Sequence, residues 1–406
     1  MTEVAQPQRR PGGSEYTGRP LRVTMVNKYY APHLGGIEYH MRDLANALVG
    51  GGWARVRAIV SNRTEKGSVE TLDGVEVFRL PRAFEYASTP VAFGMKRVLR
   101  AEGRRRSKPD VMHLHFPYPW GEISWLRAHP RVPTVLTYHS DIVRQKAMLR
   151  FYRPLLNRVL DRVDLIIASS PDMVEHSEFL SRHADKCRVV PFGIDVERFA
   201  ATPEVTARAA EIRAAHPPPI VLFVGRLIYY KGIEVLVRAM AAVDADLVIV
   251  GTGPLEDELA VLAASLGIAD RVTFLPPLPG PELIAHYHAA DVFCLPSVAR
   301  SEAFGLVQLE AHAAGTPVVS TRLTTGVPYV NQHGVTGLTV PPGDVDALAS
   351  ALDELVSDEA LRTRLGAQAL ERVRAEFAIP RMVERTLEVY HEAIRIHSAR
   401  ERGGRR

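Results

Sequence analysis

The chain has very few cysteines. Only Cys187 and Cys294 occur among 406 residues, and each lies on a separate apolar segment. Neither has a second cysteine at metal-binding spacing, so the sequence favours neither a disulfide framework nor a cysteine-based zinc site. We therefore expect two reduced thiols in a cytoplasmic protein.

Long apolar runs and a strong excess of one charge are also lacking. No run approaches the roughly 18 apolar residues of a membrane span, and residues 1–20 lack the apolar stretch of a signal peptide. The formal net charge is only +4, part of which comes from basic residues at the two ends. Nucleic acid is therefore not indicated as a partner.

The chain is too long for one hydrophobic core, which stops growing at about 250–300 residues. Short apolar strands alternate with helical stretches after residue 21, and the same rhythm restarts at residue 220. This alternation predicts an α/β fold with two doubly wound parallel sheets. The predicted segments are a disordered tail 1–20, a first domain 21–200, a linker 201–219, a second domain 220–380, a last helix 381–398 and a basic tail 399–406.

One stretch, residues 301–317, combines a loop with the start of a helix. Good helix formers run from Leu306 to Ala314, and Gly315 stands where a left-handed cap would end the helix. Gly305 would lie at the helix N-terminus, where unpaired N–H groups and the peptide dipoles attract an anion. Glu302 and Glu310 flank this site and would accept hydrogen bonds from hydroxyl groups on either side. A nucleotide sugar has this order of hydroxyls, phosphate and hydroxyls.

Two cations follow the apolar segment 220–224. The loop Gly225-Arg226 to Lys231 brings an arginine fork and a lysine charge towards one point. Such a pair can neutralise a diphosphate and the charge that develops as it leaves. The alternative, a solvated basic loop, has about equal weight without the anion-seeking helix downstream.

His139 ends an apolar strand and is predicted to project from the carboxyl edge of the first sheet. A histidine there can donate to a sugar hydroxyl or relay a proton. His113 and His115 alternate on another strand without a ligand set, so we interpret them as structural and predict no metal site. Gly35-Gly36 follows the first strand and fits either an anion cradle or a simple tight turn.

Residues 84–108 are rich in Lys and Arg, with Val91, Met95, Val98 and Leu99 at helical spacing. The segment 91–108 is therefore a candidate for peripheral contact with the inner face of an anionic membrane. A solvated helix that packs its apolar stripe on the sheet is the favoured alternative.

Taken together, Glu302 and Glu310, Gly225-Arg226 with Lys231, and Gly35-Gly36 resemble the motifs of a retaining family 4 glycosyltransferase of the glycogen-synthase and phosphatidylinositol-mannosyltransferase type. The resemblance covers residues 21 to about 395. It implies a GT-B fold with an N-terminal acceptor-binding domain, a C-terminal nucleotide-sugar-binding domain, a crevice between them and a last helix that crosses back to the first domain.

The resemblance also implies roles for individual residues. Arg226 and Lys231 would bind the diphosphate, and His139 would lie near the reacting sugar. No metal or cofactor would be needed, because the two cations and the helix N-terminus neutralise the phosphates. The remaining donor-binding positions implied by the family are Gly35, Gly36, Gly225, Glu302, Phe304, Gly305, Leu306 and Glu310.

The segment 321–329 departs from the Gly-Gly-x-Pro-Glu turn that many relatives carry. In this respect the chain resembles bacterial enzymes that transfer mannose or rhamnose to polysaccharides. We therefore expect retaining transfer of a hexose, such as mannose from GDP-mannose, to a hydroxyl of a carbohydrate, lipid-linked or small-molecule acceptor. Two alternatives use the same phosphate site: a sugar-nucleotide epimerase and a non-catalytic sensor of sugar nucleotides.

Overall fold

The structure is a computed structural model that describes residues 19–32, 35–86, 89–106, 108–141, 146–216 and 219–403. The chain forms two compact units. Unit 1 is drawn from the segments Met1–Ser169, Ser177–Gly193 and Ile379–Arg406, and unit 2 from Ser170–His176 and Ile194–Ala378. Almost all of the predicted tail 1–20 lies outside the described residues.

Unit 1 contains an eight-stranded sheet in the order β10-β9-β8-β7-β1-β2-β4-β3. Its strands are parallel except for β3, which runs antiparallel to β4. The strands are β1 (Leu21–Val26), β2 (Ala54–Ser61), β3 (Ser68–Leu72), β4 (Val75–Leu80), β7 (Val111–Phe116), β8 (Thr134–Tyr138), β9 (Leu165–Ala168) and β10 (Cys187–Val189). A separate hairpin pairs β5 (Phe84–Tyr86) with β6 (Thr89–Val91).

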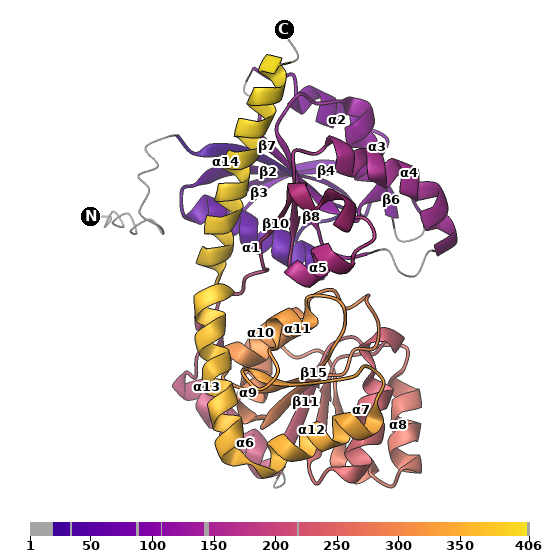
Figure 1. Cartoon of the computed structure of the whole chain (residues 1–406), viewed down its shortest axis with the longest axis vertical. Coiled ribbons are helices and arrows are strands. Elements are labelled where there is room, and N and C mark those ends of the chain that lie inside the picture. The colour runs from indigo at the N-terminus through magenta and orange to yellow at the C-terminus, as the bar shows by residue number, and fades with distance from the viewer. Residues whose placement is uncertain are drawn as a thin grey trace, which may run out of the picture. The chain divides into compact units, whose positions relative to one another are not determined.

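Helices cover the sheet of unit 1. They are α1 (Gly36–Gly50), α2 (Met95–Glu102), α3 (Pro119–Ala128), α4 (Lys146–Arg162) and α14 (Ile379–Gly403). The last helix, yellow in Figure 1, lies along the sheet of unit 1. Its Met382, Val389 and Tyr390 join Met25 and Leu44 in one buried apolar cluster, so the end of the chain completes the core of its first unit.

Unit 2 has a six-stranded parallel sheet in the order β13-β12-β11-β14-β15-β16. The strands are β11 (Ile220–Val224), β12 (Asp246–Val250), β13 (Val272–Leu275), β14 (Val292–Leu295), β15 (Val318–Thr321) and β16 (Gly337–Val340). All five residues of β11 are buried, as a parallel strand covered on both faces requires.

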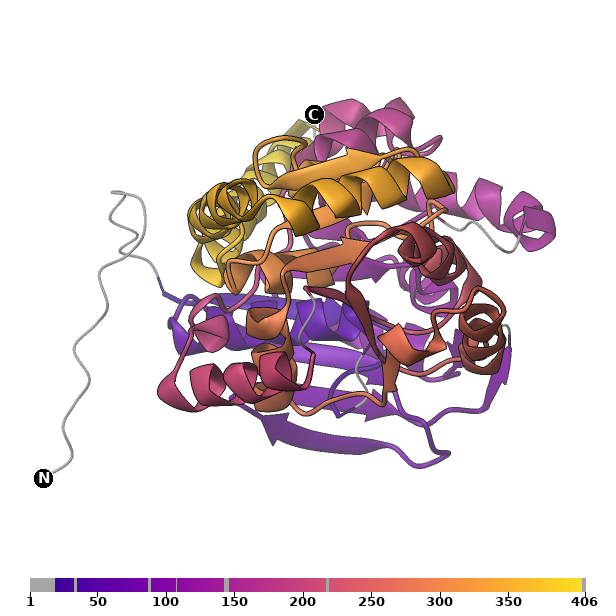
Figure 2. The ribbon, with the colours of Figure 1, turned by 90° about the horizontal axis from the view of Figure 1, so that it is seen from below.

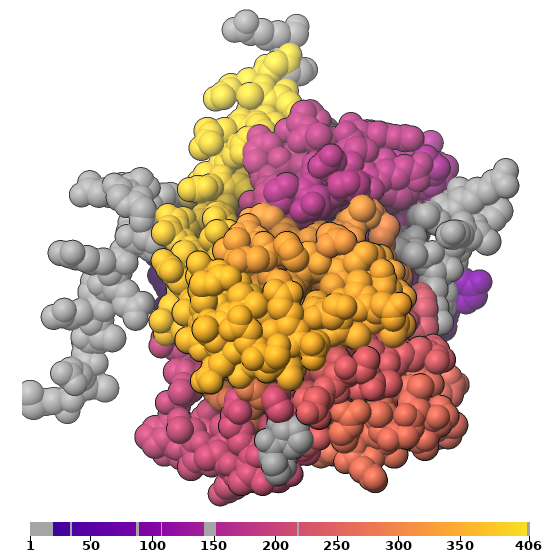
Figure 3. Space-filling model, turned by 60° about the horizontal axis from the view of Figure 1, so that its bottom comes forward, coloured from indigo at the N-terminus to yellow at the C-terminus, as the bar shows by residue number. Residues whose placement is uncertain are grey.

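Helices flank both faces of the sheet of unit 2 (Figure 2). In the space-filling view, the late residues of this unit, orange to yellow, form one continuous surface (Figure 3). Asp344 and Asp358 cap α12 and α13 by accepting from the N–H groups of Ala347 and Leu361. The helices of the unit are α5 (Pro171–His176), α6 (Pro203–Ala215), α7 (Ile233–Ala239), α8 (Glu256–Ser265), α9 (Gly280–Ala289), α10 (Leu306–Ala313), α11 (Val327–Val330), α12 (Val345–Ser357) and α13 (Glu359–Glu376).

Each sheet reverses its strand order once. In unit 2 the chain adds β12 and β13 on one side of β11 and then β14, β15 and β16 on the other. In unit 1 the corresponding reversal lies between β1 and β7. Ligands of doubly wound folds bind outside the carboxyl ends of the strands at such switch points, so these two edges are where sites are expected.

Three boundaries differ from the sequence-based expectation. The predicted linker 201–219 contains α6, which belongs to unit 2 and joins α9 through an ion pair between Arg208 and Glu282 at 2.8 Å. Val91 is expected at helical spacing with Met95, but it lies on β6, and the helix begins only at Met95. The predicted basic tail 399–406 continues α14 as far as Gly403, and the ion pair between Arg400 and Asp164 holds this last turn on unit 1.

Among the described residues, no helix is both long enough and apolar enough to cross a membrane.

Burial of Glu122 predicts a pH dependence of stability. Its side chain is 2% exposed, one oxygen accepts from the N–H of Tyr118 at 2.8 Å, and burial raises its pKa to about 8. The unfolded carboxyl titrates near pH 4.3, so this group's contribution to stability is full below that pH and is lost as the pH rises to about 8. Glu122→Gln replaces the carboxyl with a neutral amide, so the variant does not lose stability in this way as the pH rises. We expect the variant to gain about 1–3 kcal/mol relative to the parent between pH 5 and pH 8, measured by urea unfolding.

The exposed Glu354→Gln serves as the control and should show no such gain. An equal effect of Glu122→Gln at both pH values would show that the Glu122 carboxyl does not titrate in this range.

Candidate functional site

The main candidate site lies at the carboxyl ends of β11 and β14, the adjacent strands at the switch point of unit 2. The loop after β11 carries Lys231, and the loop after β14 carries Glu302. Lys231 Nζ lies 2.6 Å from Glu302 Oε2, and the two side chains are only 12% and 10% exposed. Two groups that are 71 positions apart in the sequence therefore form one buried ion pair.

Gly232 makes this approach feasible. Its φ of 67° lies in the left-handed region, and an added Cβ would fall 2.0 Å from the carbonyl oxygen of Pro296. Beside it, the N–H of Val298 donates to the carbonyl oxygen of Tyr230 at 2.8 Å. The two loops are thus held together by backbone contacts that leave no room for a side chain.

The negative charge of Glu302 stabilises the protonated form of Lys231. Burial acts to lower the pKa of Lys231, but the charge of Glu302 and its hydrogen bond outweigh burial and raise that pKa. Glu302 also accepts from Ser297 Oγ at 3.1 Å. Lys231 therefore stays protonated at neutral pH and presents a fixed positive charge.

Arg226 lies on the same loop with an exposed side chain. Burial is the main factor that raises the pKa of Tyr230, while the charges of Lys231 and Arg226 both oppose it. Lys231 and Arg226 are therefore both close enough to Tyr230 to affect its ionisation. Gly225 lies between them and the strand, where an added Cβ would be 3.6 Å from Lys231 Cε.

Gly305 caps the N-terminus of α10, as the sequence predicts. The structure adds a reason for glycine at this position. Its φ is 72°, and an added Cβ would meet Leu295 Cδ2 at 2.6 Å and Gln308 Nε2 at 2.7 Å. The backbone from Phe304 to Leu306 thus enters the helix at the edge of the sheet where Glu302 lies. The first N–H groups of the helix have no intrahelical acceptor there.

Glu310 lies within α10 and is partly exposed. It accepts from the hydroxyl of Tyr287 at 2.7 Å. Burial raises its pKa, although the Tyr287 hydrogen bond and the charge of Arg198 oppose this. The tyrosine fixes one carboxyl oxygen and leaves the other as an acceptor.

In unit 1, His139 belongs to a buried cluster of histidines. His139 Nε2 lies 3.0 Å from His115 Nδ1, and the ring of His40 lies 5.2 Å from that of His139. Burial lowers the pKa of each of these three side chains, so they are neutral at pH 7. Their nearest ligand nitrogens all lie within 4.8 Å of one another, which makes them the group in the described part of the chain that could hold a metal ion.

Gly35 and Gly36 open α1 after β1. An added Cβ on Gly36 would meet no atom within 4 Å, which leaves space beside its backbone. The N–H of Gly35 donates to Glu38 Oε2 at 3.1 Å. The carboxylate of Glu38 therefore accepts from the backbone of a glycine to which the family resemblance assigns donor binding.

The predicted site residues thus divide between the units. Unit 2 holds the donor-site set from Gly225 to Glu310, and unit 1 holds Gly35, Gly36 and His139. Sequence reasoning missed His40 and underrated His115, whose hydrogen bond to His139 gives it more than a packing role. The signal for His115 was its place one residue before the end of β7, at the same edge as His139.

Comparison with known proteins identifies the protein family for both units. Residues 34–198 match the model described as Glycosyltransferase Family 4, and residues 206–372 match that of Glycosyl transferases group 1. An O-antigen chain mannosyltransferase of Escherichia coli is 34% identical over 371 residues, which cover 91% of this chain and 98% of that protein. The chain is a family 4 glycosyltransferase. The transferase is also 33% identical to the D-rhamnosyltransferase WbpZ of Pseudomonas aeruginosa, over 88% of this chain and 92% of that protein.

Solved structures agree on the fold. Sucrose-phosphate synthase from Thermosynechococcus elongatus matches with a TM-score of 0.75 at 25% identity and covers 92% of this chain and 98% of its own. Anabaena HepE, solved in complex with UDP, matches with a TM-score of 0.71 at 21% identity over 91% of this chain and 99% of its own. The two parallel sheets are thus the Rossmann-like domains of a GT-B transferase, and the predicted family and fold are confirmed.

The close approach at Gly232 predicts that the transferase tolerates no side chain there. Gly232→Ala should displace the β11 and β14 loops from each other, because a Cβ cannot share space with the Pro296 carbonyl oxygen. We expect a loss of about 2 kcal/mol or more in unfolding free energy, from left-handed strain and the clash together, and a loss of sugar transfer. Thermal unfolding and a transfer assay measure the two effects.

Gly267→Ala is the matched control, since Gly267 also has a positive φ of 72° but open space around its Cβ position. If both variants lose stability and activity equally, backbone strain alone accounts for the effect and the loop contact has no special role.

Proposed function

We propose that the transferase moves a hexose from a nucleoside diphosphate sugar to an acceptor hydroxyl with retention at the anomeric carbon. The favoured donor is GDP-mannose or a related hexose nucleotide, and the acceptor is a glycan, glycolipid or glycoside. The relatives named mannosyltransferase and D-rhamnosyltransferase support this choice of sugar. The observation that carries the proposal is the Lys231–Glu302 pair beside the start of α10.

Charge neutralisation explains how these groups would act. When the sugar leaves, negative charge develops on the diphosphate, and fixed positive groups stabilise the transition state more than the ground state. Lys231 supplies a buried cation, Arg226 an exposed guanidinium, and α10 its N-terminal N–H groups. With these three sources the reaction needs no metal ion.

The proposed step is front-face substitution. The acceptor oxygen forms a bond to the anomeric carbon on the face from which the phosphate oxygen departs, and the acceptor proton passes to that phosphate oxygen. Glu302, whose carboxylate is held by Lys231 and Ser297, would accept from sugar hydroxyls. Glu310 would accept from the ribose hydroxyls, and neutral His139 would contact a sugar hydroxyl.

Kinetics of donor consumption test the proposal. We expect acceptor-dependent release of GDP from GDP-mannose, with the product in the donor's anomeric configuration and activity unchanged by EDTA. Arg226→Ala and Lys231→Ala should each lower kcat/KM about a hundredfold, equivalent to about 3 kcal/mol of transition-state stabilisation. NMR of the product and nucleotide release are the measurements.

Arg238→Ala on α7 removes the same charge from an exposed position in the same unit and should leave the rate unchanged. An inverted product contradicts retention, and loss of activity in EDTA contradicts metal independence. Epimerised sugar from donor alone identifies an epimerase, and binding without turnover identifies a sensor.

We further propose that unit 1 touches an anionic membrane surface, as a lipid-linked acceptor would require. The apolar stripe of α2 is not available for this contact, because Met95 and Leu99 are fully buried. Exposed rings lie just before the helix instead, with Phe84 51% and Phe93 70% exposed. Basic side chains of α2 follow them, and this mixture of rings and cations suits an anionic bilayer surface.

Vesicle co-sedimentation tests this contact. Phe84→Ser combined with Phe93→Ser should weaken binding to phosphatidylglycerol vesicles about tenfold, because both rings lose their apolar contact with the interface. Val261→Ser in unit 2 removes an equally exposed apolar side chain, 69% exposed, and serves as the control. Equal binding of the parent protein to neutral and anionic vesicles would contradict the electrostatic part of the proposal.

A further inference from the structure

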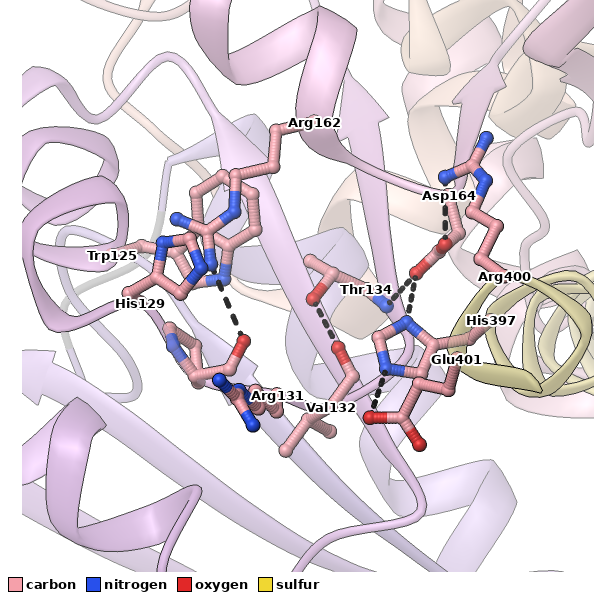
Figure 4. Close-up of a pocket in the computed structure, with 11 residues that line it drawn as sticks. Trp125, His129, Arg131, Val132, Thr134, Arg162, Asp164, His397, Arg400 and Glu401 are labelled. Atoms are coloured by element: carbon pink, nitrogen blue, oxygen red, sulfur yellow. Dashed lines mark hydrogen bonds and ion pairs between the residues drawn. The ribbon is translucent and has the colours of Figure 1, made fainter. Parts of the chain in front are cut away.

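Unit 1 has a cavity at the amino ends of β8 and β9, opposite the edge that carries His139. Its volume is about 420 Å³, within the range of small-molecule pockets. Figure 4 shows Trp125, His129 and Arg162 on one side and His397 and Arg400 of α14 on the other. An adjoining cavity of about 470 Å³ shares His129 and Arg131 with it. Neither cavity includes a residue of the candidate transfer site.

The main carboxylate of the cavity is already neutralised. Asp164 is 4% exposed and accepts from the N–H of Thr134 at 2.8 Å and from His397 Nδ1 at 3.1 Å. It also forms an ion pair with Arg400 at 3.1 Å. Asp164 therefore holds α14 in place and has little capacity to balance a further cation.

Two other cations lack such compensation. Arg162 stacks on the ring of Trp125 at 4.6 Å and donates to the carbonyl oxygens of Leu126 and Pro130. Arg131 is exposed and lines both cavities. Among the described residues, neither Arg131 nor Arg162 has a carboxylate within ion-pair distance. The charge of Arg162 is the first cause, and that of Arg131 a further one, of a lowered pKa of His129. With Arg131, Arg162 and Arg400 against the carboxylates of Asp164 and Glu401, the residues that line the cavity carry an excess of positive charge.

An unpaired buried donor points to a missing acceptor. Within the described part of the chain, the buried Trp125 Nε1 has no hydrogen-bond partner, whereas His397 Nε2 lies 3.8 Å from Glu401 Oε1. The indole N–H can only donate, and buried donors without partners are rare in native proteins. A bound group with several acceptor oxygens would satisfy it and would suit the arginine forks as well.

We propose that this cavity binds a phosphate monoester, carried either by a soluble metabolite or by a lipid headgroup. A monoester supplies nearly two negative charges and three acceptor oxygens, which match the free guanidinium donors and the indole N–H. Arg100 and Arg104, which line the adjoining cavity, extend the positive surface to the rest of the ligand. This second site is independent of the proposed transfer reaction.

Titration calorimetry tests the site with inorganic phosphate, glycerol 3-phosphate and vesicles of phosphatidic acid, each against the full chain. Arg131→Ala should weaken binding about tenfold and Trp125→Phe, which keeps the ring but removes the N–H, about fivefold. Both variants should keep the parent's rate of sugar transfer. Arg131→Ala should also keep the parent's thermal unfolding, whereas Trp125→Phe shortens a buried ring and should lower the unfolding temperature. The matched control is Arg127→Ala, which removes an exposed arginine of the same helical region that does not line the cavity.

The transfer site also attracts phosphate, so each titration is repeated in the Lys231→Ala background, where the weakening by Arg131→Ala should persist. Binding of the soluble compounds identifies a metabolite site, and binding of phosphatidic acid vesicles alone identifies a headgroup site. The proposal is overturned if none of the three probes binds, or if Arg127→Ala weakens binding as much as Arg131→Ala does.

Discussion

The ion pair between Lys231 and Glu302 is the interaction on which the candidate site of unit 2 depends. A buried pair costs desolvation energy that its own attraction barely offsets, so it persists only where the surrounding backbone fixes both partners. Here the backbone does so, because the Tyr230 and Pro296 loops touch directly and Gly232 adds no side chain between them. Burying the pair therefore costs part of the folding free energy, and as a result the positive charge of Lys231 is in position before any ligand binds.

The two units differ in the charge of the side chains at the switch points of their sheets. Unit 2 gathers fixed charge at its switch point, with Lys231, Glu302 and the N-terminus of α10. Unit 1 gathers buried imidazoles at its own, and burial keeps His115 and His139 neutral. A charged edge suits a diphosphate, whereas a neutral polar edge suits hydroxyl groups.

Much of this architecture was predictable because the parallel strands are short, rich in β-branched residues and mostly buried. The sequence predicts strands over 220–224, 246–250, 272–275 and 337–340, which are the observed bounds of β11, β12, β13 and β16. It missed β3 and β5, whose residues are almost all exposed, and it assigned Val91 of β6 to a helical pattern. The predicted linker 201–219 contains α6, which packs on unit 2 through the buried Val205, Ala209 and Ile212 and pairs Arg208 with Glu282 of α9. Local sequence contains no information about such a partner.

The candidate site shows the same division between local and distant information. Gly305, Lys231 and Glu302 were recognisable because each follows a strand end, but their contact depends on strand order, which the sequence does not display. His115 was interpreted as structural for a related reason, since its partner His139 lies on the next strand of the sheet. The end of the chain adds a further contribution. Tyr390 of α14 contacts His113 Nδ1 at 2.8 Å, and the ring of His113 stacks on that of His115 at 4.4 Å. The last helix thus orients a histidine cluster whose members precede it by more than 200 residues, so α14 acts on the first unit's polar edge as well as on its core.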